Sequence, residues 1–315
     1  MLCERIPRPR IEGEFVLIYR PGADVYKGPD SLCFRNGVAY DEWIPNDFSL
    51  LRVGDCWHMV GITHPRPAGL ASDYDYDGAT VHDGEFQLFH AEATGETFAS
   101  LVYPESFAER EKILWPQDRP GEINEIWAPH LMQYAGGYRI IYSPHDIRAA
   151  DSRDFVSWQP GRVLFRGEDA TARDPFVYCE DGIHYLLYVV QNCILCRTSR
   201  DNMQTWDAPF VMYENPFAST DGAPHHASCE SPFLLKREGY YYLFWCICDG
   251  YCGCYDNRTF VIAARDLRGF RDLAPIAMLS GHAPEIVTDT DGSTWLLSVF
   301  YLENGVSAVR LAWEK

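Results

Sequence analysis

The chain has 315 residues, of which 47% are hydrophobic, and it carries a formal net charge of −18 with 9 Trp, 19 Tyr and 17 Phe. This length and apolar content exclude a disordered protein, allow a large core, and the aromatic residues favour strands. The negative charge and the absence of a dense Lys/Arg tract argue against nucleic acid as a partner.

The first residues, "MLCERIPRPRIEGEF", have charges and prolines where a secretory signal needs an apolar stretch. No apolar run approaches the roughly 18–20 residues of a membrane helix. Eleven cysteines, an odd number spread over a long chain, are typical of reduced thiols rather than of a disulfide framework. We therefore expect a cytosolic protein with no membrane partner, and the oligomeric state stays open.

One hairpin pattern recurs along the chain. Each copy has a polar head, a short apolar strand, a turn containing glycine and an aromatic-rich return strand, which is a hairpin signal. The copies are "NDFSLLRVGDCWHMVGI" from Asn46, "WAPHLMQYAGGYRIIYS" from Trp127, "RDPFVYCEDGIHYLLYV" from Arg173, "ESPFLLKREGYYYLFWC" from Glu230 and "HAPEIVTDTDGSTWLLSVF" from His282.

A second signature follows the hairpins. It reads "SRDFVSW" at 152–158, "SRDNMQTW" at 199–206 and "ARDLRGF" at 264–270, with a fainter version, "AEATGETF", at 91–98. A unit of several strands repeated about five times predicts a five-bladed β-propeller, because stacked blades cover faces that one blade leaves exposed. An all-β sandwich with coincidental hairpins is the alternative.

We place the propeller at residues 41–315, with no separate β-sandwich domain. Residues 1–40 form an N-terminal extension containing the strand-like "EFVLIYR". This extension either closes the ring against the last blade or contributes to an oligomer contact.

In a propeller, residues that begin equivalent inner strands become neighbours at one mouth of the axis. Aligning the repeats on Pro129, Pro175, Pro232 and Pro284, with Phe48 in the first, brings two sets of positions together. One set comprises Asp47, Ala128, Asp174, Ser231 and Ala283, and the position before it holds Asn46, Trp127, Arg173, Glu230 and His282. Three carboxylates, from Asp47, Asp174 and Glu230, are thus predicted to meet.

Crowded carboxylates repel one another, so the pKa of at least one rises and it stays protonated near neutral pH. Cleavage of a glycosidic bond uses such a set. One carboxylic acid protonates the leaving oxygen, while an opposing carboxylate attacks the anomeric carbon or activates water. We therefore interpret Asp47, Asp174 and Glu230 as candidate catalytic residues; capping of strand ends is the alternative for each.

From about Asp41 to the C-terminus the chain resembles the five-bladed propeller glycosidases of glycoside hydrolase families 43 and 32. The match lies in "ND" at 46–47, "RDP" at 173–175 and "ESP" at 230–232, in order and blade. The resemblance implies that Asp47 is the general base or nucleophile, Asp174 the transition-state stabiliser and pKa modulator, and Glu230 the general acid.

Details of the motifs point to both families. "WAP" at 127–129 and "GH" at 281–282 are similar to family 43, which implies inversion and pentosides such as arabinofuranosides or xylosides. "RDP" and Asn46 are similar to family 32, but residues 43–49 read W-I-P-N-D-F-S instead of the W-M-N-D-P-N-G of that family. A retaining β-fructosidase-like enzyme, a transferase acting on an acceptor sugar or phosphate, and a non-catalytic carbohydrate-binding propeller remain alternatives.

Further residues are candidates for binding the oligosaccharide or glycoside. Trp127 and Trp43 would stack on a sugar face or belong to the core, and Asn46, His130, His145 and Arg173 are polar candidates, with Arg173 also suited to an ion pair. His282 is a candidate for substrate or for a metal, because the resemblance places a calcium ion or a water near an axial histidine. No cofactor is expected to be required, and His225 and His226 fall in a loop that we expect to shape the pocket.

Two cysteine patterns have a metal or redox interpretation. In "CICDGYCGC", the residues Cys246, Cys248, Cys252 and Cys254 would face one another across a hairpin and bind zinc. The spacing departs from the usual pairs, and a buried cysteine is an ordinary small hydrophobic residue, which we favour here. "CILC" at 193–196 lacks the βαβ context of a redox motif.

Overall fold

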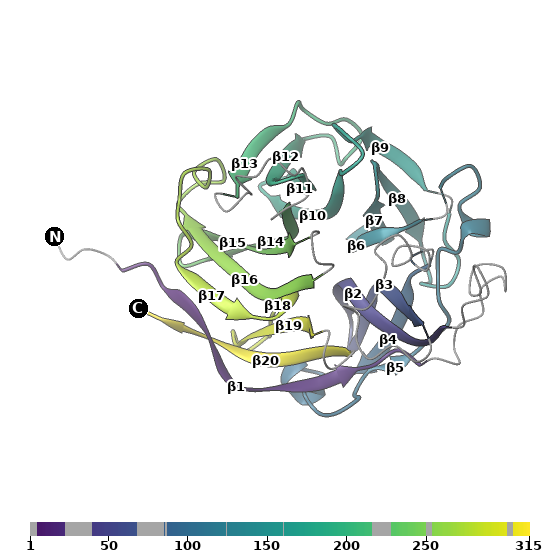
Figure 1. The fold of residues 1–315 in the computed structure, drawn as a ribbon, viewed down its shortest axis with the longest axis horizontal. Helices are drawn as coiled ribbons and strands as arrows, with labels where there is room; N and C mark the ends of the chain where they lie inside the picture. Colours follow the sequence, from purple (N-terminus) through teal and green to yellow (C-terminus); the bar gives the residue numbers. More distant parts are fainter. Residues whose placement is uncertain are drawn as a thin grey trace.

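Five four-stranded sheets surround a central axis in the computed structural model of the protein (Figure 1). The structure describes residues 5–22, 40–67, 85, 87–123, 125–159, 161–215, 228–249, 254–300 and 305–315, without the side chains of 40–43, 64–67, 248–249, 254–256 and 300. All strand pairs within the sheets are antiparallel. The predicted five-bladed β-propeller is confirmed.

The first four blades each use four consecutive strands. Blade 1 contains β2 (Tyr40–Val53), β3 (Cys56–Pro67), β4 (Phe89–Thr94) and β5 (Ala108–Glu109). Blade 2 contains β6 (Trp127–Tyr134), β7 (Gly137–Ser143), β8 (Asp146–Ser152) and β9 (Arg162–Arg166). Blade 3 contains β10 (Arg173–Glu180), β11 (Ile183–Val190), β12 (Cys193–Ser199) and β13 (Phe210–Glu214). Blade 4 contains β14 (Ser228–Arg237), β15 (Tyr240–Asp249), β16 (Cys254–Ala264) and β17 (Ala277–Ser280).

Blade 5 combines the two ends of the chain. Its strands are β18 (His282–Thr288), β19 (Thr294–Phe300), β20 (Gly305–Glu314) and β1 (Arg8–Tyr19). β1 lies outermost and pairs with β20 from Arg8 opposite Glu314 to Tyr19 opposite Val306, as Figure 1 shows. The N-terminal strand therefore completes the last sheet of the ring.

Tight turns join the first and second strands of the blades. In blades 3 and 4 both central turn residues have positive φ, at Asp181 and Gly182 (51° and 75°) and at Glu238 and Gly239 (46° and 79°). Two successive positive φ values belong to the type I′ turn, whose twist matches that of the flanking strands. This explains the glycine in the repeated hairpin pattern.

The second repeated signature forms a turn after the third strand of a blade. Asp154 Oδ1 accepts hydrogen bonds from the backbone N–H groups of Val156 and Ser157, at 2.9 and 2.7 Å. Asp201 plays the same part in blade 3, where it accepts from Gln204 and Thr205. An aspartate that satisfies its own following backbone is a common way to build such a turn.

Apolar side chains fill the spaces between neighbouring blades. Between blades 3 and 4, for example, Leu187 and Trp245 belong to one buried cluster, and between blades 1 and 2 Val60 and Ile140 belong to another. Each sheet thus covers the faces of its neighbours. Two short 3-10 helices, Phe98–Leu101 and Pro116–Asp118, interrupt the connections. Among the described residues, no helix has the length and apolar content to span a membrane.

Candidate active site

The inner strand of every blade has an irregularity at the same place. The pairing register shifts between Asn46 and Phe48, and at the equivalent positions of β6, β10, β14 and β18. In those four strands the residue before the proline has a left-handed φ, of 40° at Ala128, 56° at Asp174, 47° at Ser231 and 50° at Ala283. Non-glycine residues in this region cost of order 1–3 kcal/mol, and such strain collects at functional sites.

These shifted residues line a small cavity of about 30 Å³ on the propeller axis. All five blades contribute to its wall. The lining comprises Asp47, Phe48, Ala128, Pro129, His130, Asp174, Pro175, Phe176, Ser231, Pro232, Ala283, Pro284 and Glu285. The set of positions formed by Asp47, Ala128, Asp174, Ser231 and Ala283 therefore meets around one cavity, although 184 residues separate Asp47 from Ser231.

Ser231 connects two of the predicted carboxylates. Its hydroxyl donates to Oδ1 of Asp47 at 2.5 Å, and its backbone N–H donates to Oδ2 of Asp174 at 3.0 Å. Asp174 is only 4% exposed. Two acidic groups from blades 1 and 3 thus meet on a residue of blade 4, directly beside Glu230.

Arg173 lies between the second and third carboxylates. Its Nε is 3.6 Å from Oδ2 of Asp174, and its Nη2 is 3.4 Å from Oε1 of Glu230. Nη2 also donates to Oγ of Ser228 and to the carbonyl of Cys229, at 2.9 and 3.0 Å. The guanidinium therefore partly neutralises the acidic cluster and fixes the start of β14; whether it also binds substrate stays a prediction.

Burial and mutual repulsion shift the acidity of the cluster. Burial, and then the charge of Glu230, raise the pKa of Asp47 to about 6, against the lowering effects of His282 and of the Ser231 hydroxyl. Burial and the charge of Asp47 raise the pKa of Asp174 well above its usual value, although Arg173 opposes this. The cluster consequently retains a proton at pH values where isolated carboxylates are ionised.

His282 contacts Glu230 from the side of blade 5. Its Nε2 is 3.3 Å from Oε2 of Glu230, and both residues are buried. Burial by itself lowers the pKa of His282, but hydrogen bonding and charge from Cys246 and Glu230 outweigh it and raise the pKa well above the usual value. The Glu230 carboxylate is therefore bracketed by Arg173 on one side and His282 on the other.

The neighbours of His282 bear on the expectation of an axial calcium. Calcium takes six to eight oxygen ligands. His282 interacts with the carboxylates of Glu230 and Asp47 and with the thiol of Cys246. These two carboxylates supply part of such a ligand set, and an axial calcium stays a prediction.

The remaining predicted residues occupy different depths. Trp127 is half-buried at the start of β6, with its ring centroid 6.2 Å from that of the exposed His145. Asn46 is buried at the same level of β2, opposite Ile62. His130 lies deeper in the wall of the axial cavity, where it packs against Phe176 at 4.8 Å and burial lowers its pKa to about 4.

Several predictions fall outside the described part of the structure. The side chain of Trp43 and the residues His225 and His226 lie outside the described residues. Of the four cysteines considered for zinc, Cys246 is buried against Thr259, with Sγ 3.4 Å from Oγ1, and the side chains of the other three are not described. Cys246 thus packs as a small buried residue next to the acidic site.

Two further acidic residues lie at the site that the aligned repeats did not single out. The charge of Glu85, which is 1% exposed, raises the pKa of Asp47. Glu285 lines the axial cavity and accepts a hydrogen bond from the backbone of Leu50; burial, and to a lesser extent the charge of Asp47, raise its pKa well above normal. Glu285 follows the aligned proline directly, so its position in the fifth repeat was the available signal.

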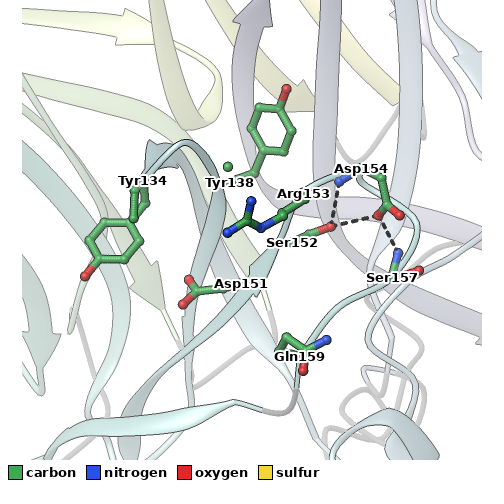
Figure 2. Close-up of a pocket in the computed structure, with 10 residues that line it drawn as sticks. Tyr134, Tyr138, Asp151, Ser152, Arg153, Asp154, Ser157 and Gln159 are labelled. Atoms are coloured by element: carbon green, nitrogen blue, oxygen red, sulfur yellow. Dashed lines mark hydrogen bonds between the residues drawn. The ribbon is translucent and has the colours of Figure 1, made fainter.

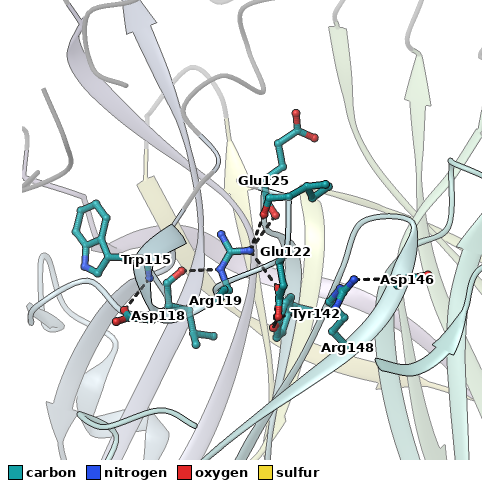
Figure 3. Close-up of polar contacts among 10 residues, drawn as sticks. Trp115, Asp118, Arg119, Glu122, Glu125, Tyr142, Asp146 and Arg148 are labelled. Carbon is teal, nitrogen blue, oxygen red and sulfur yellow. Dashed lines mark hydrogen bonds and ion pairs between the residues drawn. The ribbon is translucent and has the colours of Figure 1, made fainter. Parts of the chain in front are cut away.

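A polar network holds the segment that leads into Trp127. Arg119 donates to the carbonyls of Leu114, Ile123 and Glu125, and Figure 3 shows it next to Glu122, whose carboxylate lies 3.3 Å away. Glu122 in turn accepts from the hydroxyl of Tyr142 on β7, at 3.0 Å. These bonds join the connection after blade 1 to blade 2, and so fix the wall of the site on that side.

A larger hollow lies elsewhere. Its volume is about 380 Å³, and Figure 2 shows its lining around the β6–β7 turn, with Tyr134, Tyr138 and Arg153. This turn is at the opposite end of β6 from Trp127. The hollow therefore belongs to the far face of the propeller and has no contact with the acidic cluster.

Comparison with known proteins identifies the class to which this geometry belongs. Residues 105–269, just over half of the chain, match the sequence model of "Glycosyl hydrolases family 43". The chain belongs to this family. A protein of this family is a glycoside hydrolase, and its substrate is a carbohydrate.

Solved structures support the fold of this family 43 protein. A thermostable family 43 glycoside hydrolase superposes with a TM-score of 0.59 at 14% identity, covering 88% of this chain and 91% of that one. The catalytic domain of a family 62 α-L-arabinofuranosidase from Coprinopsis cinerea gives 0.60 at 13% identity, covering 97% of each chain. An endo-arabinase from Bacteroides thetaiotaomicron gives 0.58 at 13% identity, covering 86% and 95%. No curated protein sequence matches the chain.

Proposed function

We propose that this family 43 protein hydrolyses pentosides, with α-L-arabinofuranosides and β-xylosides as the substrate class, and that it does so with inversion. The observation that carries the proposal is the convergence of Asp47, Asp174 and Glu230 through Ser231 and Arg173. The sugar class rests on the structural neighbours, which include an arabinofuranosidase, arabinanases and a xylosidase.

The proposed roles follow from the surroundings of each carboxylate. Asp47, with a pKa of about 6, is ionised at neutral pH. Because this pKa lies near the working pH, the carboxylate is suited to take a proton from water as general base. Burial and the charge of Asp47 raise the pKa of Asp174 well above its usual value, which suits a residue that sets the charge of the cluster. Glu230 delivers a proton to the leaving oxygen as general acid.

A panel of aryl glycosides and oligosaccharides tests the substrate class. Aryl α-L-arabinofuranoside, aryl β-D-xylopyranoside, aryl β-fructofuranoside and arabinan oligomers are compared, and the configuration of the first product is read by proton NMR. Turnover of the first two or of the oligomers with inversion supports the proposal. Turnover of the fructoside alone, retention, or saturable binding without turnover overturns it.

The acid role is tested by Glu230→Gln. General acid catalysis contributes typically 10²–10⁴-fold, so we expect kcat to fall by that order on an oligosaccharide. The loss should be much smaller on an aryl glycoside with an acidic leaving phenol, which needs no protonation. Glu180→Gln, at the far end of β10 where Glu180 accepts from Tyr241, is the matched control. An unchanged rate for Glu230→Gln removes the assignment.

A further inference from the structure

A second cluster of reactive side chains lies away from the axis, on β3 and β4 of blade 1 (Figure 1). Cys56 and His58 are two residues apart on β3, and His90 and Glu92 are two residues apart on β4, so each pair occupies one face of its strand. His58 lies directly opposite Glu92 in the register. The four side chains thus share one face of the sheet.

The polar atoms of this cluster point at a common centre. His58 Nδ1 is 3.1 Å from His90 Nε2 and 3.2 Å from Glu92 Oε1, and His90 Nε2 is 3.5 Å from the same oxygen. An ion bound tetrahedrally with bonds of about 2.0–2.1 Å holds its ligand atoms about 3.3–3.4 Å apart. The three atoms therefore already have the spacing of one face of a zinc coordination tetrahedron.

Hydrogen bonding alone does not account for this triangle. Two neutral imidazoles bring at most two protons to their three contacts, so at least one pair of atoms would face each other without a proton between them. A cation at the centre gives every lone pair a partner. His58 and His90 are 7% and 4% exposed, which raises the cost of leaving such a contact uncompensated.

The thiol of Cys56 lies beside two of these three atoms and is the candidate for a fourth ligand. Its Sγ lies within 4.8 Å of the ligand atoms of His58 and Glu92. Around the cluster, Arg110 Nε donates to the other oxygen of Glu92 at 2.7 Å, and the Phe155 ring of blade 2 stacks on His58 at 3.8 Å and 4°. Such outer contacts orient ligands and shield a metal from water.

We infer that Cys56, His58, His90 and Glu92 form a structural zinc site that ties β3 to β4 and stiffens the contact between blades 1 and 2. The set of one thiolate, two imidazoles and one carboxylate suits zinc, and closed four-coordinate sites are structural rather than catalytic. The site is separate from the acidic cluster, so it does not depend on the proposed hydrolysis.

Metal binding by the full chain tests this inference. The protein is stripped with a chelator and titrated with zinc alone against a chromophoric competitor, and with cobalt as a spectroscopic probe. We expect one zinc per chain and a rise in melting temperature that depends on zinc concentration. His58→Ala and His90→Ala should each weaken binding by more than the 10–100-fold typical of outer contacts, whereas His184→Ala, on blade 3, should not.

The cysteine gives a readout that a misfolded variant cannot imitate. Cys56→Ser should remove the thiolate-to-cobalt charge-transfer band while cobalt still binds, and Cys179→Ser, an exposed control, should leave the band in place. Survival of the band in Cys56→Ser overturns the inference. So does the absence of zinc binding at micromolar concentrations, or full binding by folded His58→Ala and His90→Ala proteins.

Discussion

The hydroxyl of Ser231 donates a hydrogen bond to Asp47 at 2.5 Å across two blades of the propeller. Because this bond stabilises the ionised carboxylate, it lowers the pKa of Asp47 against the effect of burial. Ser231→Ala should therefore raise that pKa from about 6 by roughly one unit. The acidic limb of kcat/KM against pH should move to higher pH by the same amount.

Ser152→Ala is the control for this shift. Ser152 receives backbone hydrogen bonds from Asp154 and Phe155 at the far end of β8, so its loss should lower stability and leave the pH profile in place. An acidic limb that stays unmoved in Ser231→Ala would show that Asp47 does not act as the base.

Glu85→Gln should shift the same limb in the opposite direction. The charge of Glu85 raises the pKa of Asp47, and the amide removes that charge with almost no change of volume. Since this charge affects the pKa of Asp47 less than burial, Glu230, His282 and Ser231 do, a shift of less than about one unit to lower pH is expected. Glu109→Gln, whose carboxylate accepts from Lys112 near β5, serves as control. A shift to higher pH contradicts the prediction.

Asp47→Asn should abolish activity and stabilise the fold at neutral pH. The pKa of Asp47 is about 6 in the folded chain and near 3.8 when unfolded, so the folded state binds the extra proton between these values. The contribution of Asp47 to the stability of the parent protein therefore falls as pH rises from about 4 to 6, and the variant escapes a cost of about 1–3 kcal/mol at pH 7. Urea unfolding of both proteins at pH 4 and pH 7 measures the difference, which should nearly vanish at pH 4. A variant less stable at pH 7 contradicts it.

Arg173→Met should damage both stability and activity. Removing one partner from a buried charged cluster costs about 3–5 kcal/mol, because Asp174 and Glu230 lose their shared guanidinium. Arg139→Met is matched as a nearly buried arginine that binds a carboxylate, that of Asp151, with two hydrogen bonds. It should lose stability while the folded fraction keeps full kcat. Equal kcat losses in the two variants would show that Arg173 has no special role.

The fold was predictable because the five hairpins repeat their polar heads in register. The proximity of Asp47, Asp174 and Glu230 followed from that register alone, since equivalent positions of different blades meet at the axis. The left-handed backbone before the prolines was not predictable in the same way. It coincides with the register shift that each of these inner strands has at this place, which depends on the pairing with the second strand of the blade.

Residues outside the repeat were missed for a physical reason. Glu85 falls between β3 and β4, outside the five aligned hairpins, so no alignment of repeats reaches it. His58 and His90 fall on alternating strand positions that suggest ordinary core residues. Their meeting depends on the pairing of β3 with β4, across a long stretch of intervening chain.

The pairing of β1 with β20 makes the last blade depend on residues from both ends of the chain. During synthesis β1 leaves the ribosome long before β20. Its backbone N–H and C=O groups therefore lack their β20 partners until residue 314 has been synthesised. The earlier blades are contiguous and have no such delay. Assembly thus ends with a single joining event, and a nascent chain halted before that event would present an open strand edge at each side of an unfinished ring.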